Sequence, residues 1–133
     1  MIQEDKMLLI KDLSARLPYA VTVEHTSGFR GTLHDITVHH MYDDNDDIYD
    51  AICYTDFFGD EDSIYIEYFK PYLLPLSSMT KEQKREYENT TIKDGVLTVW
   101  TTWTYDWLNE NHFDYRGLIP KNLALDASGL NIY

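Results

Sequence analysis

Residues 19–38, YAVTVEHTSGFRGTLHDITV, contain the pattern that decides the fold. Tyr19, Val21 and Val23 alternate with smaller or polar residues, which is the period of a half-buried strand. Thr26-Ser27-Gly28 then interrupts the pattern, and Gly28 is free to adopt the positive φ that tight turns require. Apolar residues resume at Phe29. The stretch therefore predicts an antiparallel hairpin.

The second strand of this hairpin changes phase. Leu33 lies on one parity, whereas Ile36 and Val38 lie on the other. A β-bulge near His34 and Asp35 would restore the alternation. Gly31, inside the same strand, would allow the sharp bend that small barrels use.

An amphipathic helix is predicted before the hairpin, over residues 7–17. Leu9, Leu13 and Leu17 recur at a spacing of four, and Ile10 widens the apolar face. Pro18 ends the helix, because proline has no N–H to donate and disfavours helix in the preceding residue. We expect four polar residues to lie on the opposite face: Lys6, Lys11, Asp12 and Arg16.

Further strands are predicted over residues 48–54 and 63–69, followed by an extended segment over 70–76. Thr80 and Gln83 form a capping-box pattern at the start of a polar surface helix that reaches about Glu88. Asp94-Gly95 predicts the turn of a hairpin between 90–93 and 96–103.

The last part of the chain is expected to return to the core. Thr104 is predicted to cap a short helix that reaches Asn111. Pro120 prevents one continuous helix over 113–127. That segment carries apolar residues that can pack on the core: Leu118, Ile119, Leu123 and Leu125.

Together these elements predict one α+β domain over residues 1–133. Its centre is a strongly bent antiparallel sheet or a small SH3/Sm-like barrel, with an N-terminal helix and C-terminal helical segments. This prediction rests on the leading helix followed by a bent pair of strands. A fold of this kind does not by itself indicate a function.

The charge of the chain is concentrated in one stretch. The sequence has 23 acidic and 11 basic residues, a formal net charge of −12. Between Arg30 and Lys70 there are eleven acids and no base, so the rest of the chain is nearly neutral. This charge argues against direct nucleic-acid binding, which needs lysine and arginine, and against binding to anionic membranes. It favours a partner with a basic surface.

Other features of composition point to a cytoplasmic protein. Cys53 is the only cysteine, so no internal disulfide can form. The first residues carry acids where a secretory signal needs positive charge, and the apolar run 7–10 is too short to span a membrane. The sequence does not indicate an oligomeric state.

The acids that flank the predicted strand 48–54 form the candidate partner-binding site. They occupy both of its connections, and we expect them to project from the same end of the sheet. The site comprises Asp43, Asp44, Asp46, Asp47, Asp60, Glu61 and Asp62.

Metal sites are less favoured interpretations of the same region. Asp43, Asn45 and Asp47 have the spacing of the first three ligands of an EF-hand loop. The required glycine at the sixth position is Ile48, and the required glutamate at the twelfth is Tyr54. A weak, non-specific cation site at 43–47 remains an alternative to a solvated acidic loop.

Histidines and the cysteine give no local catalytic or zinc motif. His39 and His40 are adjacent, so in a strand they point to opposite faces, and neither they nor His25 and His34 have zinc-ligand spacing. A Cys53–His112 pair lacks activation, because neighbouring acids raise a thiol pKa. We assign no catalytic residue, metal or cofactor.

Three tryptophans, Trp100, Trp103 and Trp107, follow the second predicted hairpin. Trp103 and Trp107 are four residues apart and could stack along the helix. Packing at the core is the favoured interpretation, and a shelf for a ligand is the alternative.

Three stretches carry a resemblance to known sequences: 11–19, KDLSARLPY; 69–80, FKPYLLPLSSMT; and 107–119, WLNENHFDYRGLI. With them the chain resembles a family of small acidic proteins encoded by gut bacteria and by their phages and mobile elements. That family has no established activity, so no site residue is transferred. The chain departs from it in a longer, more acidic segment 43–62, and in residues 128–133, SGLNIY, where the resemblance leads us to expect a proline near Ser128.

The sequence therefore predicts a non-enzymatic accessory protein that engages a basic partner through the acidic stretch 35–67. One alternative is a nucleic-acid mimic that inhibits a nucleic-acid-binding protein, which requires carboxylates along one exposed face. The other is a metal-dependent or hydrolytic enzyme, which requires histidines and acids that converge in a cavity.

Overall fold

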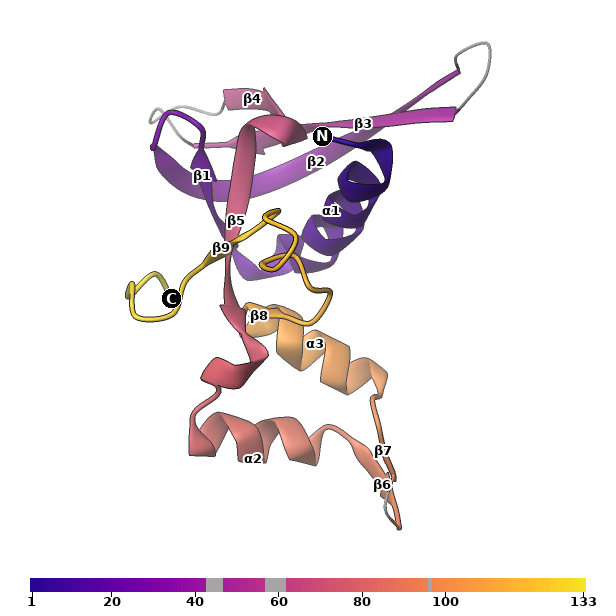
Figure 1. Cartoon of the computed structure of the whole chain (residues 1–133), viewed down its shortest axis with the longest axis vertical. Helices are drawn as coiled ribbons and strands as arrows, with labels where there is room; N and C mark the ends of the chain where they lie inside the picture. The colour runs from indigo at the N-terminus through magenta and orange to yellow at the C-terminus, as the bar shows by residue number, and fades with distance from the viewer. Residues whose placement is uncertain (43–46, 57–61, 96) are drawn as a thin grey trace.

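The computed structural model describes residues 1–42, 47–56, 62–95 and 97–133. It is an α+β structure with an N-terminal helix, a seven-stranded mixed sheet, and two further helices (Figure 1). Strands β2 and β3 lie across one end of the molecule, and α2 and α3 lie at the other. Strand β5 runs between the two ends.

Helix α1 (Gln3–Arg16) begins four residues earlier than the sequence pattern indicates. Leu9 and Leu13 are fully buried, as their spacing predicts. A short 3₁₀ turn, Leu17–Tyr19, follows and contains Pro18, so the predicted end of the helix is confirmed. The prediction for the polar face is wrong at three positions: Lys6, Asp12 and Arg16 are buried, and only Lys11 is exposed.

The predicted hairpin is present. Strands β1 (Thr22–His25) and β2 (Arg30–Tyr42) pair antiparallel, with Val23 opposite Gly31. Gly28 in the turn has a φ of 95°, in the region that favours glycine. The register of β2 against its other neighbour shifts between Leu33 and Asp35, which confirms the predicted bulge.

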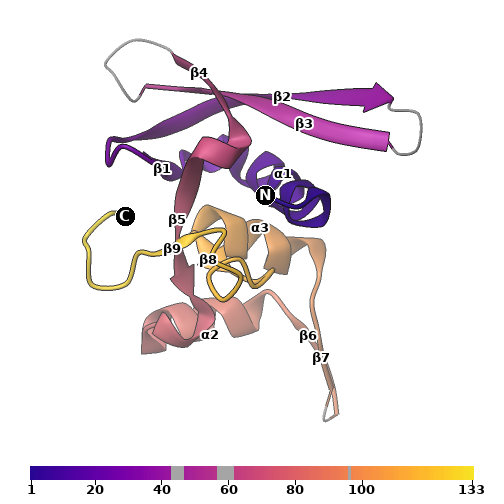
Figure 2. The same cartoon turned by 45° about the horizontal axis from the view of Figure 1, so that its top comes forward.

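Strand β3 (Asp47–Thr55) pairs antiparallel with β2, and β4 (Asp62–Tyr65) pairs antiparallel with β3. Of the β3 side chains that the structure describes, those of Ala51, Cys53 and Thr55 are fully buried. Helix α1 packs beneath these strands (Figure 2). Among the described side chains of β3, the small ones, rather than those of Ile52 and Tyr54, therefore face the helix.

The predicted strand 63–69 is wrong in one respect, because a 3₁₀ turn, Ile66–Tyr68, divides it. Ile66 is fully buried in that turn, and a new strand, β5 (Phe69–Pro75), begins after it. The turn redirects the chain, so that β5 pairs with β1 instead of continuing β4.

Strand β5 joins antiparallel and parallel parts of the sheet. It pairs antiparallel with β1 on one side, and parallel with β8 (Phe113–Asp114) and β9 (Leu125–Asp126). The sheet order is β4-β3-β2-β1-β5-β8, with β9 also on β5. The sheet is thus mixed rather than antiparallel, and the described strands form no closed barrel.

Residues 76–112 form a separate projection that we call the hairpin lobe. It contains a 3₁₀ turn (Leu76–Ser78), α2 (Lys81–Asn89), β6 (Ile92–Asp94), β7 (Leu97–Val99) and α3 (Thr102–Glu110). The capping box of Thr80 and Gln83 is confirmed, and α2 has no buried residue. The prediction that Thr104 caps α3 is wrong, because the N-cap is Thr101. The side chain of Thr104 accepts a bond from the backbone N–H of Thr101 and so completes a second capping box.

The segment after α3 returns to the core, as the sequence predicts. Leu118 is fully buried, and Leu123 is almost so. Asp114 holds the turn at this point, because its two carboxylate oxygens accept hydrogen bonds from the backbone N–H groups of Leu118 and Ile119. These residues pack against α1 and the sheet.

Candidate functional site

The predicted acidic site lies mostly outside the described residues. Asp47 is the first residue of β3 and Asp62 is the first of β4, and the structure describes their backbone only. The other five predicted residues are not described: Asp43, Asp44, Asp46, Asp60 and Glu61.

The described strands nevertheless show that the two acidic connections do not leave the same end of the sheet. Strand β3 begins beside the end of β2, where Tyr42 pairs with Asp47, and it ends beside the start of β4, where Thr55 pairs with Asp62. A strand of nine residues spans about 30 Å. The prediction of one shared end is therefore wrong, because successive antiparallel strands turn at alternate ends.

Three acids within the stretch already have partners inside the chain. Asp50 lies 3.5 Å from the ammonium nitrogen of the buried Lys6. Asp56 accepts a hydrogen bond from the backbone N–H of Thr32 and lies 3.7 Å from Nε2 of His34. Asp35 is exposed, and its carboxylate accepts a bond from the next backbone N–H.

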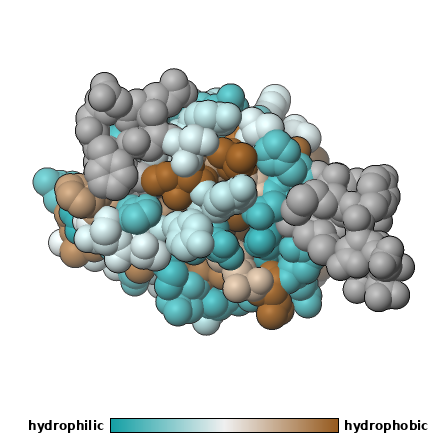
Figure 3. Space-filling model, turned by 90° about the horizontal axis from the view of Figure 1, so that it is seen from above, coloured by the Kyte–Doolittle hydropathy of each residue, from teal (hydrophilic) through white to brown (hydrophobic). Residues whose placement is uncertain are grey.

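Strands β2, β3 and β4 expose one face to solvent, opposite the face that packs on α1. Cross-strand partners share a face of a sheet, so Thr37, Ile52 and Tyr65 form one row of this outer face, and Asp35, Tyr54 and Ser63 form the next. Tyr65 is 48% exposed. Figure 3 looks onto this end of the molecule and shows a small apolar area surrounded by hydrophilic side chains.

The histidines whose side chains are described lie in different parts of the fold. His25 is the last residue of β1, and its Nδ1 accepts a bond from the backbone N–H of Ser27 in the following turn at 3.1 Å. His34 and His39 are exposed on β2, and the side chain of His40 is not described. Among the described residues, no group of three or more histidine, cysteine, aspartate or glutamate side chains could hold a metal ion.

Cys53 is fully buried on β3. Burial, together with the nearby charges of Asp50 and Asp35, raises the pKa of its thiol to about 12. At neutral pH the sulfur is therefore a protonated core group, because only the thiolate is a nucleophile.

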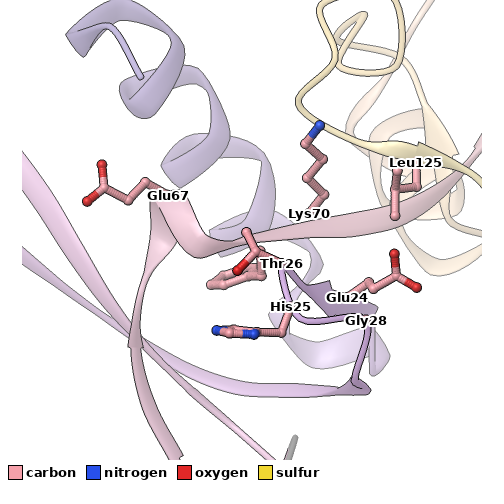
Figure 4. Close-up of a pocket in the computed structure, with 8 residues that line it drawn as sticks. Glu24, His25, Thr26, Gly28, Glu67, Lys70 and Leu125 are labelled. Carbon is pink, nitrogen blue, oxygen red and sulfur yellow. The ribbon is translucent and has the colours of Figure 1, made fainter.

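A shallow cavity of about 280 Å³ opens between the β1–β2 turn and β5. Its lining includes Glu24, His25, Glu67 and Lys70 (Figure 4). In that view the carboxylates of Glu24 and Glu67 point away from each other, and Nζ of Lys70 donates to Oδ1 of Asn122 at 2.9 Å. The charged groups diverge, so the cavity offers polar contacts rather than a focused acid–base pair.

A buried ionic cluster links α1 to the segment after α3, and the sequence analysis missed it. Asp12 and Arg16 are both fully buried. The Nε of Arg16 donates to Asp12 Oδ2 at 2.8 Å, and one terminal nitrogen donates to the carbonyl oxygen of Phe113 at 2.6 Å. Arg116 lies 3.4 Å from the other oxygen of Asp12. The ring of Tyr115 lies beneath both guanidinium groups, with 5.3 Å and 5.0 Å to its centroid.

The cluster ties α1 to the segment after α3 through a fully buried pair, Asp12 and Arg16. Arg116 is partly exposed, and Nη1 of Arg16 and Nε of Arg116 are buried without a hydrogen-bond partner among the described residues. The sequence signal of the cluster was the i,i+4 spacing of Asp12 and Arg16, which permits an ion pair on one helix face. Burial of that face could not be read from the spacing.

His112 and Tyr133 form another contact that the sequence did not predict, and it is only partly buried. Their rings stack with centroids 3.6 Å apart and an interplanar angle of 7°. The hydroxyl of Tyr133 accepts a bond from the N–H of Thr22 and donates to the carbonyl of Tyr72, so it bridges β1 and β5. Burial, together with the charge of Arg16, lowers the pKa of His112 to about 4.

The three tryptophans have different surroundings. Trp100 lies among Tyr87, Tyr105 and Tyr115 in edge contacts, and its indole N–H donates to the hydroxyl of Tyr87 at 2.7 Å. Trp107 stacks on Phe113 instead of Trp103. Trp103 is 73% exposed, so core packing is wrong for this residue.

Comparisons with known proteins return no family model, no curated protein and no solved structure that matches this chain. Within the described part of the chain, no helix has both the length and the apolar character needed to cross a lipid bilayer.

Proposed function

We propose that this chain is a non-enzymatic interaction protein that binds a partner with a basic surface through an acidic surface formed by residues 35–67. In keeping with the resemblance of its sequence, it would act in the cytoplasm as an accessory protein of a phage or mobile element. The observation that carries the proposal is the solvent-exposed outer face of β2, β3 and β4, which lies within a stretch of eleven acids without a base.

This face has the chemistry of a protein-binding surface. Half-buried Tyr54 lies directly opposite exposed Asp35, and exposed Tyr65 lies in the neighbouring row of the same face. Tyrosine is enriched at protein interfaces, where its ring packs and its hydroxyl remains hydrogen-bonded. The surrounding negative charge accelerates the approach of a basic partner and fixes its orientation.

Nucleic-acid mimicry is the less favoured version of the same proposal. It needs carboxylates spaced along one face in the manner of phosphates. The connections 43–46 and 57–61 join β3 at opposite ends, which separates the two groups of acids.

The proposal is tested by affinity capture from nuclease-treated lysate of a gut bacterium. Wild type is compared with a variant in which Asp43, Asp44, Asp46 and Asp47 are changed to asparagine, and with a second variant, Asp35→Asn with Tyr65→Ala. A matched control changes three exposed acids of the hairpin lobe to amides: Glu82, Glu86 and Glu110.

We expect a basic protein to be retained by wild type and the control, and lost from at least one of the two sheet variants. Its association rate, measured with purified proteins, should fall as salt is added. Equal capture by all four proteins would contradict the proposal. If this chain and nucleic acid compete for the same site on the captured protein, the result would favour mimicry.

A further inference from the structure

The β6–β7 hairpin of the lobe has one apolar face. Ile92 pairs with Val99, Lys93 with Thr98, and Asp94 with Leu97. Because cross-strand partners share a face and successive residues alternate, Ile92, Leu97 and Val99 all lie on one side of the ribbon. Lys93 and Thr98 lie on the other side.

The apolar face is open to solvent. Ile92 is 57% exposed, Leu97 67% and Val99 51%. Trp103 and Tyr105, on the first turn of the following helix, are also exposed. The hairpin projects away from the rest of the fold (Figure 1), and a two-stranded ribbon of this size is marginally stable in water unless something covers it.

The base of the hairpin is firmly held. The hydroxyls of Thr101 and Thr104 both donate to the carbonyl oxygen of Thr90, at 2.8 and 3.0 Å, and so join α3 to the end of α2. On the polar side of the ribbon, Lys93 lies 4.0 Å from Glu88 of α2. The chain therefore presents the apolar face on a fixed support.

The charge distribution indicates which partner fits. The hairpin lobe has six acids and four bases, so it is nearly neutral, and the apolar face carries no charge except Asp94 beside the turn. Such a face offers nothing specific to a strongly basic or acidic partner. A second copy of this chain matches it, because an apolar ribbon can pack on itself about a two-fold axis.

The acidic stretch does not oppose this pairing. Its described part belongs mainly to β2, β3 and β4, at the end of the molecule opposite the hairpin (Figures 1 and 2). In a pair joined through the hairpins, the two acidic ends would therefore be far apart, well beyond the screening length of roughly 8 Å in physiological salt.

The exposed apolar area is of the right order. The five residues are between 44% and 73% exposed, which corresponds to accessible surface on the order of 600 Å² for the hairpin face and the start of α3 together: Ile92, Leu97, Val99, Trp103 and Tyr105. Monomers rarely leave a larger contiguous apolar patch uncovered, and a standard interface buries about 800 Å² on each partner.

We propose that two copies of this chain associate through the apolar faces of their β6–β7 hairpins, in a two-fold symmetric pair flanked by Trp103. This association goes beyond the proposed binding of a basic partner and does not depend on it. It would present two acidic ends from one assembly and so allow bivalent binding.

The first experiment is sedimentation equilibrium of the whole chain, up to about 200 µM, a concentration at which a micromolar Kd leaves most of the protein paired. We expect the apparent mass of wild type to rise from 15.7 kDa toward twice that value. Leu97→Lys and Val99→Lys should each weaken association about tenfold or more, because they bury an unpaired charge. The matched control is Thr98→Lys, which adds the same charge to the opposite face and should leave association unchanged.

A second measurement locates the interface. In a Cys53→Ala background, Leu97→Cys should form an intermolecular disulfide under mild oxidation, whereas Thr98→Cys should not. A wild type that stays monomeric over the whole concentration range would overturn the proposal. So would an association that Leu97→Lys and Val99→Lys leave intact while their circular dichroism matches that of wild type, because the interface would then lie elsewhere.

Discussion

The sheet and the hairpin lobe differ in how they are stabilised. Most residues of the hydrophobic core cluster belong to α1, the sheet or the segment after α3. The other two are Val21, just before β1, and Ile66, in the 3₁₀ turn before β5, and none belongs to residues 76–112. Among the described residues of the lobe, only Thr104, Leu108 and Asn109 are buried. The lobe depends instead on two capping boxes and on edge contacts among aromatic rings at its base.

This contrast separates stability from recognition. The sheet and α1 bury charge and apolar surface together, so changes there should affect the whole fold. The lobe places large apolar side chains in solvent, where they contribute little to folding and are free to contact another molecule. Each of the following predictions tests one side of this comparison.

The largest effect is expected for Asp12→Asn. This change leaves Arg16 buried without its counter-ion, and removing one partner of a buried pair costs about 3–5 kcal/mol. Urea unfolding measures the loss, with Glu4→Gln on an exposed part of the same helix as the control. A loss below about 1 kcal/mol would mean that water reaches the cluster.

A paired substitution compares the two regions directly. Leu73→Ala, at a fully buried position of β5, should cost about 2–5 kcal/mol because it opens a cavity. Leu97→Ala, on the exposed hairpin, should change the stability of dilute protein by less than about 0.5 kcal/mol. Similar losses for both variants would show that the hairpin packs on its own chain.

The contact between His112 and Tyr133 should make stability depend on pH. The folded state lowers the pKa of His112 from 6.5 to about 4, so the folded protein binds this proton less readily than the unfolded chain. Its contribution is complete above about pH 6.5 and is lost as the pH falls toward 4. We expect the unfolding free energy of wild type to fall in this window relative to His112→Phe. Parallel pH profiles would contradict the assignment, and the NMR titration of His112 gives its pKa independently.

A loss smaller than that of the buried variants is expected at the helix caps of the lobe. Thr101→Ala removes the cap of α3 and the bond to the carbonyl of Thr90, and should cost about 1 kcal/mol. Thr101→Ser keeps both bonds and should be nearly neutral. Hydrogen exchange should show the loss in α2, α3 and the hairpin, while β5 keeps its protection. Equal loss of protection in β5 would mean that the lobe and the sheet unfold together.

Local features were predictable from the sequence. The fourfold spacing of Leu9 and Leu13, the stop at Pro18, the capping box at Thr80, and the bulge after Leu33 are all present. Each depends on residues close together in the chain, whose geometry follows from backbone sterics and hydrogen bonding. The β6–β7 hairpin, predicted from Asp94-Gly95, belongs to the same class.

The candidate sites were less predictable. The concentration of acids was evident in the sequence, but the expectation that both connections share one end of the sheet ignored the alternation of antiparallel strands. The burial of Asp12 and Arg16 and the exposure of Trp103 were also missed. From sequence alone, a charged residue is expected in solvent and a tryptophan in the core. Asp12 and Arg16 are buried because the fold pairs their charges, and Trp103 is exposed because no other described segment covers it.

By itself, the sequence determined the main helices and hairpins, the acidic stretch, and the near neutrality of the remainder, because these follow from residue type and short-range spacing. Tertiary structure alone decided that Ile66–Tyr68 turns the chain, and that β8 and β9 pair parallel with β5. It also decided that one face of the β6–β7 hairpin stays open. These outcomes depend on which distant segments pack on the same apolar surface. That choice involves many segments of the chain together, so short-range spacing cannot predict it.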